Sequence, residues 1–378
     1  MTDVGPVPPN SAQPVPASYL TLRGIRKSFG RECVLDGLNL DVSEGEYLVV
    51  LGPSGCGKST LLQIIAGLVR PDSGDVKLAS RSLDRVSPKD RDVSILFQDD
   101  RLYPHWNLRK NLELACDRSP VKKHQSGDPV LELAQRLNIG GLLQRRPDEI
   151  SGGQLRRAAL AKALLRQPAV CLLDEPFAAI DTMMREDLIS LLADFPRERG
   201  GGCSQTSVVH VTHDGEEAMR LADRIVVLGG GRVLQSGTPD DIYRKPQSLD
   251  VAKAIGTPPA NMIAGNQVRA MLADRYDQLV QALPGCHDSS TFIVRPEHIR
   301  LALQTDVSDR DGDICDGQWR LAATVLSSRF VAGRWLASIS VDADRELVLT
   351  VSSPLEIGPA GRHVIAHVSL ADIVCVPG

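Results

Sequence analysis

A glycine-rich segment that follows an apolar run limits the possible folds of this chain more than any other part of its sequence. Residues 52–60 read Gly-Pro-Ser-Gly-Cys-Gly-Lys-Ser-Thr, a full match to the pattern G-x-x-x-x-G-K-[ST]. The motif follows the apolar stretch Glu46–Leu51 and opens the stretch Lys58–Val69, which has helical character. A strand, a glycine-rich turn and a helix in this order predict a P-loop. We therefore expect an α/β domain that binds a nucleotide.

The chemistry of this loop is phosphate binding. Its glycines allow backbone N–H groups to turn toward an anion, and the N-terminus of the next helix adds a favourable dipole. Lys58 is expected to reach the β- and γ-phosphates, and Ser59 is expected to ligate Mg²⁺. Alone, the loop indicates a class that also includes GTPases and small kinases. The residues expected to hold the nucleotide are Gly52, Pro53, Ser54, Gly55, Cys56, Gly57, Lys58, Ser59 and Thr60.

Two carboxylates follow a second apolar strand. Residues 170–176 read Val-Cys-Leu-Leu-Asp-Glu-Pro, so Asp174 ends the strand beside the phosphate loop. There Asp174 can orient Mg²⁺ through water, and Glu175 can polarise the attacking water. A buried strand followed by a polar turn would have the same pattern, so this motif alone leaves both interpretations open.

A third motif lies at the start of the predicted helix Gln154–Arg166. Residues 150–154 read Ile-Ser-Gly-Gly-Gln, and a serine with two glycines at a helix start forms another anion-binding N-terminus. The segment at 150–154 lies between the phosphate loop and the carboxylates, and with this order residues 19–256 resemble the ATPases of ABC transporters, whose signature is LSGGQ. The chain departs from that family at three positions. Ile150 stands where leucine is usual, Leu155 where arginine is usual and Ala178 where serine is usual.

The resemblance implies roles for further residues. In this family two subunits face head to tail, and ATP lies between the phosphate loop of one and the signature of the other. The cofactors are then ATP and Mg²⁺, and the catalytic residues are Glu175 and His213. The expected metal ligands are Ser59, Gln98 and Asp174. The other residues expected at the nucleotide are Phe29, stacking on adenine, Gln98, Asp181 and the signature residues Ser151, Gly152, Gly153 and Gln154.

The rest of the first domain fits an α/β fold. Residues 19–40 alternate apolar and polar side chains, which predicts an antiparallel β subdomain. Further strands are predicted at residues 93–97, 169–173, 207–211 and 225–228, with helices between them. This alternation predicts a mainly parallel sheet covered on both sides, with a helical subdomain.

The pattern changes near Gly256. Beyond Thr291 short strand-like runs recur, which predicts a small all-β, OB-like domain. We expect a disordered Pro-rich tail over residues 1–18, an ATPase domain over 19–256 and an OB-like regulatory domain over 257–378.

Composition limits the other possibilities. The net charge of -4 and the pI near 6.1 do not support a nucleic-acid-coating protein. The eight cysteines form no C-x-x-C pair, so we expect a reducing cytosol in which most are small buried hydrophobes. No apolar run approaches the ~18–20 residues that span a bilayer, so another polypeptide would supply a channel.

Residues 208–263 look more specifically like the carbohydrate-importer branch, which includes the maltose and glycerol-3-phosphate importers, and Val294–Ile299 is similar to the entry of that branch's OB-like domain. The resemblance implies a homodimer on the cytoplasmic face of the membrane, bound to integral membrane permease subunits and served by an external solute-binding protein. A carbohydrate or glycerol phosphate is the preferred cargo. Importers of polyamine, iron, sulfate or molybdate, and a soluble ABC ATPase, remain alternatives. A guanine-binding N-K-x-D motif is absent, which argues against a GTPase.

Overall fold

The structure is a computed structural model of the chain. It describes residues 18–97, 102–117, 127–178, 180, 182–194, 205–283, 286–287, 289–303 and 313–377. Contacts divide the chain into two compact units: unit 1 holds residues 1–48 and 59–210, and unit 2 holds residues 49–58 and 211–378. The predicted tail lies outside the described residues apart from Ser18.

Unit 1 begins with the predicted antiparallel strands. They form a four-stranded sheet in the order β2-β1-β4-β5. Leu20, Leu22 and Ile25 of β1 are fully buried, so this sheet packs one apolar face against the rest of unit 1. Its strands are β1 (Ser18–Phe29), β2 (Glu32–Ser43), β4 (Ser73–Leu78) and β5 (Arg81–Ser82).

A six-stranded sheet carries the strand ends that position the site. Its order is β10-β9-β3-β8-β7-β6, so β3 lies between β9 and β8, neither of which is next to it in the sequence. β6 and β7 run parallel, whereas β9 and β10 form an antiparallel hairpin. Every residue of β3, β7 and β8 is buried, as in strands covered on both faces. The strands are β3 (Tyr47–Leu51), β6 (Val93–Leu96), β7 (Val170–Asp174), β8 (Ser207–Thr212), β9 (Arg224–Gly229) and β10 (Arg232–Gly237).

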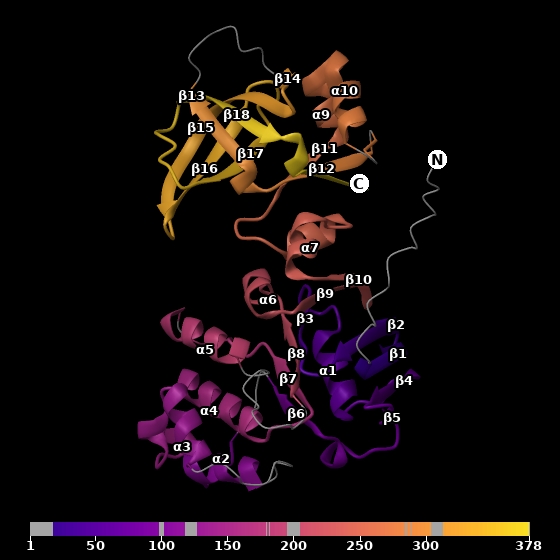
Figure 1. The fold of residues 1–378 in the computed structure, drawn as a ribbon, viewed down its shortest axis with the longest axis vertical. Coiled ribbons are helices and arrows are strands. Elements are labelled where there is room, and N and C mark those ends of the chain that lie inside the picture. Colours follow the sequence, from indigo (N-terminus) through magenta and orange to yellow (C-terminus); the bar gives the residue numbers. More distant parts are fainter. Residues whose placement is uncertain are drawn as a thin grey trace, which may run out of the picture. The chain divides into compact units, whose positions relative to one another are not determined.

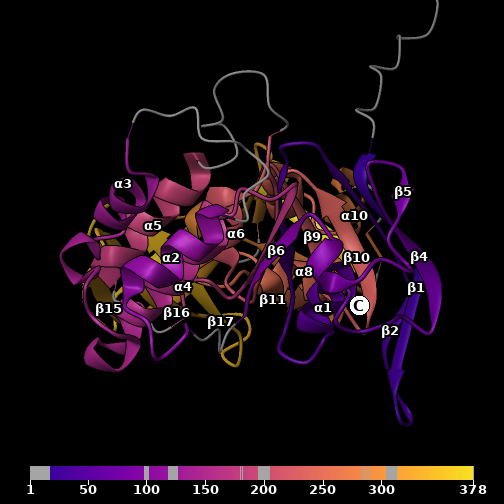
Figure 2. The same cartoon turned by 90° about the horizontal axis from the view of Figure 1, so that it is seen from below.

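Helices α2 to α5 lie on one side of unit 1, and the strands β1, β2, β4 and β5 lie on the other (Figure 2). This arrangement confirms the helical and antiparallel subdomains predicted from the sequence. Within the described residues, no helix is long and apolar enough to cross a membrane. The α-helices of unit 1 are α1 (Lys58–Ala66, which starts in unit 2), α2 (Leu108–Asp117), α3 (Pro129–Arg136), α4 (Gly152–Leu165) and α5 (Thr182–Asp194).

Unit 2 continues with three short helices and then with a β-rich region (Figure 1). The predicted C-terminal strands are confirmed, and two short helices, α9 and α10, pack beside them. The helices are α6 (Gly215–Leu221), α7 (Pro239–Arg244), α8 (Leu249–Ala254), α9 (Gly265–Leu272) and α10 (Tyr276–Ala282).

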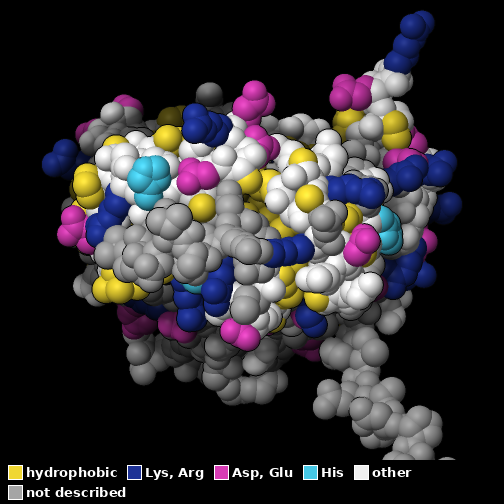
Figure 3. Space-filling view, turned by 90° about the horizontal axis from the view of Figure 1, so that it is seen from above, with side chains coloured by type: hydrophobic (Ala, Val, Ile, Leu, Met, Phe, Trp, Pro, Cys, Tyr) yellow, Lys and Arg dark blue, Asp and Glu magenta, His cyan; other side chains and the backbone are white. Residues whose placement is uncertain are grey.

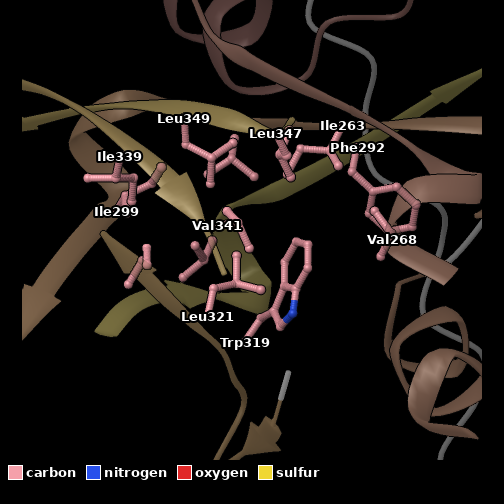
Figure 4. Close-up of a cluster of buried hydrophobic side chains, with 14 of the residues drawn as sticks. Ile263, Val268, Phe292, Ile299, Trp319, Leu321, Ile339, Val341, Leu347 and Leu349 are labelled. Carbon is pink, nitrogen blue, oxygen red and sulfur yellow. The ribbon is translucent and has the colours of Figure 1, made fainter. Parts of the chain in front are cut away.

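The β-rich region contains two sheets. One has the order β11-β12-β19, and the other has the order β13-β18-β15-β16-β17, with β14 paired to β15. The fully buried Trp319 and Phe292 lie in their common apolar core (Figure 4). The strands are β11 (Asn261–Ala264), β12 (Ser290–Val294), β13 (Ile299–Leu303), β14 (Asp313–Cys315), β15 (Gln318–Val331), β16 (Arg334–Val341), β17 (Val348–Ser353), β18 (His363–Ser369) and β19 (Ile373–Pro377).

The structure contains a disulfide that was not predicted from the sequence. Cys286 and Cys375 form a disulfide, with their Cα atoms 5.7 Å apart and a sequence separation of 89. No local motif predicts this bond, because the two residues meet only when β19 pairs with β12. Cys56 and Cys171 are buried thiols, as expected.

Surface charge is mixed on the face shown in Figure 3. Among the residues coloured there, Lys and Arg side chains lie among Asp, Glu and scattered apolar side chains. On this face the described charges therefore do not form a surface of a single sign.

Arg295 joins the residues after β12 to the segment that precedes β11. Its guanidinium, 4% exposed, donates to the carbonyl oxygens of Ile255 at 2.7 Å and Tyr243 at 3.0 Å, and it lies 4.1 Å from the centroid of the Tyr243 ring. The Tyr243 hydroxyl donates to Glu297. Gly256 has φ +103°, and a Cβ there would lie 2.9 Å from Nη1 of Arg295. This part of unit 2 is therefore built around one buried arginine.

Replacing Arg295 with methionine is expected to lower the free energy of unfolding by about 2–3 kcal/mol, because buried carbonyl groups lose their donor. Urea denaturation followed by tryptophan fluorescence would measure the change. Arg300→Met, at an exposed position of β13, is the matched control and should leave the midpoint nearly unchanged. Equal midpoints for the two variants would contradict the role given to Arg295.

Candidate functional site

The phosphate loop leaves the end of β3 and turns sharply. The N–H of Gly52 donates to the carbonyl oxygen of Thr212 at 3.3 Å. A Cβ on Gly52 would lie 2.4 Å from the carbonyl oxygen of Leu228, so no side chain fits there. Gly55 and Gly57 have φ values of +82° and +103°, which glycine adopts without steric cost. Gly52 is therefore required because the backbone of Leu228 lies too close for a side chain. Gly55 and Gly57 are required because their backbone has a positive φ.

Lys58 is folded into the curve of this loop. Its side chain is only 6% exposed, and Nζ donates to the carbonyl oxygens of Gly52 at 2.7 Å and Pro53 at 2.9 Å. Ser54 is exposed at the outer part of the loop, and Thr60 is partly buried in α1. The loop thus holds a cation beside the start of α1, which is an arrangement suited to an anionic phosphate.

Ser59 and Asp174 are brought together by the fold. Ser59 Oγ donates to Asp174 Oδ1 at 3.3 Å, and Asp174, at the end of β7, is 7% exposed. Hydroxyl and carboxylate oxygens are the hard ligands that Mg²⁺ prefers. Two predicted metal ligands therefore meet, while the predicted Gln98 and Asp181 lie outside the described residues.

Glu175 follows β7 in a left-handed backbone conformation, with φ +45°. That conformation is uncommon for a residue other than glycine. Next to it lies the guanidinium of Arg156, 7% exposed, whose Nη2 donates to the carbonyl oxygens of Asp174 at 2.7 Å and Glu175 at 2.8 Å. The same guanidinium donates to the carbonyl oxygens of Pro176, at 3.4 Å, and Phe97.

Arg156 was not predicted from the sequence. The available signal was its position two residues before the mostly apolar run 158–165 of α4, because an arginine on a buried helix needs acceptors.

The predicted signature forms the N-terminus of α4. Ser151 Oγ accepts from the N–H of Gln154 at 3.3 Å, and Gln154 Oε1 accepts from the N–H of Ser151 at 3.0 Å, which is a capping box. Ser151 and Gly152 are exposed, while Gly153 and Gln154 are partly buried. A Cβ on Gly152 would meet no atom within 4 Å. Packing within this chain therefore does not require that glycine, whereas a ligand or second chain close to the backbone would.

His213 is exposed in the turn between β8 and α6. The turn is held by Thr212 Oγ1, which donates to Glu217 Oε2 at 2.6 Å and accepts from the N–H of Asp214 at 3.0 Å. Asp214 in turn caps α6 by accepting from the N–H of Glu216 at 2.8 Å. A rigid turn thus presents the imidazole at the end of a buried strand.

Phe29 ends β1 with half of its side chain exposed (50%). Nζ of Lys27 lies 5.3 Å from the centroid of the Phe29 ring and forms an ion pair with Asp72 at 2.9 Å. The bond from Lys27 holds the pKa of Asp72 below its ordinary value. An exposed aromatic face at this position is suited to stacking on a planar base.

Cys56 is expected to react slowly with alkylating agents near pH 7. It is 8% exposed, and burial raises the pKa of its thiol above the ordinary value, although Lys58 opposes the shift. Because the thiolate is the nucleophile, labelling should accelerate as the pH rises through that pKa. Peptide mass spectrometry after iodoacetamide treatment would compare Cys56 with the exposed Cys33.

Complete labelling of Cys56 should also block ATP hydrolysis, because the added group occupies the phosphate loop. Labelling of Cys56 as fast as Cys33 at pH 7 would contradict the first expectation. Unchanged hydrolysis after full modification would contradict the second.

Comparison with known proteins places these features in a family. Residues 35–178 match the family model described as "ABC transporter". The sn-glycerol-3-phosphate import ATP-binding protein UgpC of Brucella abortus biovar 1 (strain 9-941) is 37% identical over 310 residues, covering 82% of this chain and 84% of the relative. UgpC 3 of Rhizobium johnstonii is 42% identical over 289 residues, covering 75% of this chain and 80% of the relative.

Solved structures agree with the sequence relatives. A dimeric post-hydrolysis state of the ATP-binding cassette MJ0796, bound to ADP and Pi, has a TM-score of 0.51 and is 28% identical. It covers 58% of this chain and 98% of the solved chain. Phosphate loop, signature helix and carboxylate turn occur here in that order along the chain, as expected of such a cassette. The chain therefore belongs to the ATP-hydrolysing, ATP-binding subunits of ABC transporters.

Proposed function

We propose that this chain energises a binding-protein-dependent importer of glycerol phosphate or a carbohydrate. The observation that carries the proposal is the similarity to import ATP-binding proteins, which includes both the cassette and much of the C-terminal region: 82% of the chain in one alignment. A likeness confined to the cassette would indicate ATP hydrolysis without indicating import.

The geometry supports assigned roles in ATP hydrolysis. The loop from Gly52 to Thr60 would hold the phosphates, with Lys58 at the β- and γ-phosphates and Phe29 on the adenine. Ser59 and Asp174 would hold Mg²⁺, and their hydroxyl and carboxylate oxygens fit that ion. Bound Mg²⁺ would neutralise charge that develops on the phosphate oxygens.

Glu175 would take the role of general base. It follows Asp174 directly, so its carboxylate is suited to orienting water for attack on the γ-phosphate. His213, exposed on its rigid turn, would contact the same phosphate. Gln98 and Asp181 are proposed at the site from the family order alone.

A second subunit would complete each site. The exposed N-terminus of α4, with Ser151, Gly152, Gly153 and Gln154, is the surface that would meet the nucleotide of the partner. The solved cassettes of similar fold are described as dimeric, which supports a homodimer. Permease subunits in the membrane and an external solute-binding protein would provide the path and the cargo, with this chain on the cytoplasmic face.

We also propose the functional division of the chain. Residues 19–256 would form the ATPase domain, and residues 257–378 an OB-like regulatory domain. The β-rich sheets that follow residue 261 support the second assignment.

Transport measurements would test the proposal. Cells lacking the gene should lose uptake of radiolabelled sn-glycerol 3-phosphate, and the wild-type gene should restore it while the Glu175→Gln variant should not. Loss of maltose uptake instead would shift the cargo to a carbohydrate. If uptake of glycerol 3-phosphate and maltose is unchanged and uptake of sulfate, molybdate, iron or polyamine is reduced, the proposed cargo is wrong but the assignment as an importer stands. ATP hydrolysis without any uptake defect would reject import.

A further inference from the structure

Arg156 occupies an unusual place between two functional elements of unit 1. It lies on α4, two positions after the last signature residue, Gln154. Its guanidinium reaches the carboxylate turn after β7, where it donates to the carbonyl oxygens of Asp174 and Glu175. One buried side chain thus connects the helix that carries the signature to the backbone that carries the proposed general base.

The contacts of Arg156 explain an otherwise unfavourable backbone. Glu175 has φ +45°, a conformation that a side chain with a Cβ enters at an energetic cost. Nη2 of Arg156 bonds the carbonyl groups on both sides of the Glu175 Cα, at 2.7 and 2.8 Å. The N–H of Ala178 closes the turn by donating to the carbonyl oxygen of Glu175 at 3.1 Å. The direction of the Glu175 side chain therefore depends on where Arg156 holds these carbonyls.

The same guanidinium also donates to the carbonyl of Phe97, directly before the predicted Gln98. A rigid five-donor fork can hold several carbonyls in one plane, which an ammonium group cannot do. The neighbouring Arg157 provides a comparison within the helix. It donates to the carbonyl oxygens of Gly153 at 3.4 Å and Leu137 at 3.1 Å, all within the helical part of unit 1.

We propose that Arg156 is a positioning residue that couples the two ATP sites of the dimer. The inference rests on the proposed function, in which the signature of one subunit contacts the nucleotide of its partner. A shift of α4 caused by that contact moves Arg156, and Arg156 moves the turn that aims Glu175 at the subunit's own nucleotide. Occupancy of one site thereby sets the geometry of the base in the other.

Kinetics of Arg156→Met and Arg157→Met would test the coupling. Arg156→Met is expected to lower kcat for ATP hydrolysis by about 10²-fold while changing KM less than about twofold, because the base is misdirected and the phosphate loop is intact. Its Hill coefficient for ATP should fall toward one. Arg157→Met should keep the wild-type kcat and cooperativity. A retained Hill coefficient in Arg156→Met, or equal losses in the two variants, would overturn the proposal.

Hydrogen exchange of the nucleotide-free protein tests the role of Arg156 independently of the proposed transport function. Exchange of the Ala178 amide should accelerate by about tenfold or more in Arg156→Met relative to Arg157→Met, whether or not the protein transports anything. Unchanged exchange of the Ala178 amide would show that Arg156 does not hold this turn, even if ATP hydrolysis is lost. Where Arg156→Met does not fold, Arg156→Lys, which keeps the charge but not the planar fork, should show the same two effects at smaller size.

The disulfide of unit 2 carries a second, independent inference. Cys286, 5% exposed, follows α10, and Cys375, partly exposed, lies on β19, the last strand. The side chains of β19 alternate between two cores. Ile373 and Cys375 pack in the core of the β-rich region, whereas Val374 and Val376 pack against a cluster that contains Ala252 of α8.

A strand at the edge of a sheet opens more easily than an interior strand. Among the described strands, β19 pairs with β12 and lies at the edge of the three-stranded sheet. The bond between Cys286 and Cys375 ties this strand to the segment after α10. It therefore also secures the apolar cluster beneath α8.

We infer that Cys286 and Cys375 form a reversible, redox-controlled disulfide that holds β19 in place. The inference rests on the proposed cytoplasmic location, where protein disulfides are usually transient or redox-sensing. The more exposed Cys375 thiolate would attack a low-molecular-weight disulfide and release one thiolate. The Cys286 thiolate would then displace the second, which leaves the protein disulfide and two reduced small thiols. The reverse exchange reopens it.

Oxidised and reduced glutathione, applied to the full chain, would test this disulfide. Peptide mapping should find the link between Cys286 and Cys375 with oxidised glutathione and lose it with reduced glutathione. Oxidation should raise the melting temperature by roughly 5–10 °C and slow exchange in β19 and α8. Cys375→Ser should abolish these responses, whereas Cys33→Ser, at an exposed thiol, should keep them. Glutathionylated Cys375 without the internal bond, or an internal bond without protection of β19, would overturn the inference; neither readout requires ATP hydrolysis.

Discussion

Glu175→Gln is expected to lower kcat for ATP hydrolysis by about 10²–10⁴-fold while leaving ATP binding nearly intact. The amide has almost the same size as the carboxylate but cannot accept a proton from the attacking water. The left-handed backbone at this position suits glutamine no worse than glutamate, and the bonds from Arg156 Nη2 to the main-chain oxygens of residues 174 and 175 do not need the carboxylate. The variant should therefore fold normally and bind ATP but hydrolyse it very slowly.

Three measurements would check this outcome. Phosphate release measures kcat, equilibrium binding of a fluorescent ATP analogue measures affinity, and size-exclusion chromatography with ATP should show a trapped dimer. Glu132→Gln, at an exposed position of α3, is the matched control and should behave like the wild type. Full turnover by Glu175→Gln would remove Glu175 from the role of general base.

Lys58→Ala is expected to weaken ATP binding by about 10- to 100-fold, because the ion pair between the ammonium group and the phosphates is lost. The change also removes the donor to Gly52 and Pro53, which leaves two loop carbonyls without their bond to Nζ. The curve of the loop should loosen as a result. Both effects act on binding, so this variant should differ from Glu175→Gln, which acts on chemistry.

Isothermal titration calorimetry with ATP would measure the loss. Lys58→Arg tests geometry separately from charge, because a guanidinium keeps the positive charge but cannot fit inside the loop as an ammonium does. We expect it to bind ATP poorly as well. Wild-type affinity in Lys58→Ala would show that the backbone alone holds the phosphates.

Contiguous motifs made much of this site predictable. The phosphate loop, the carboxylates at the end of β7 and the signature at the start of α4 are each short stretches in which backbone demands and chemistry coincide. Glycines at residues 55 and 57 do adopt positive φ, and Ser151 does cap its helix. Such motifs are local in the sequence, so they can be recognised without knowledge of the fold.

Weaker periodicity left other elements unpredicted. β19 has only five residues at the C-terminus, and α9 and α10 are short helices inside a region with strand-like runs. Helices of this length gain their stability from packing, so their sequences carry little signal. Val268 lies in the core with Trp319 (Figure 4). Leu272 and Leu279 are buried in the same core, which holds the two helices in place.

The motifs are enough to predict a nucleotide-binding α/β cassette, because Gly52–Thr60 and the motifs after it specify backbone shape and chemistry together. They do not predict that Arg156 holds the backbone of Glu175, that Arg295 bonds Tyr243 and Ile255, or that Cys286 meets Cys375. Each of these contacts joins residues far apart in the chain. Such contacts form only when tertiary packing excludes water and brings distant donors to buried acceptors, so only the folded structure decides them.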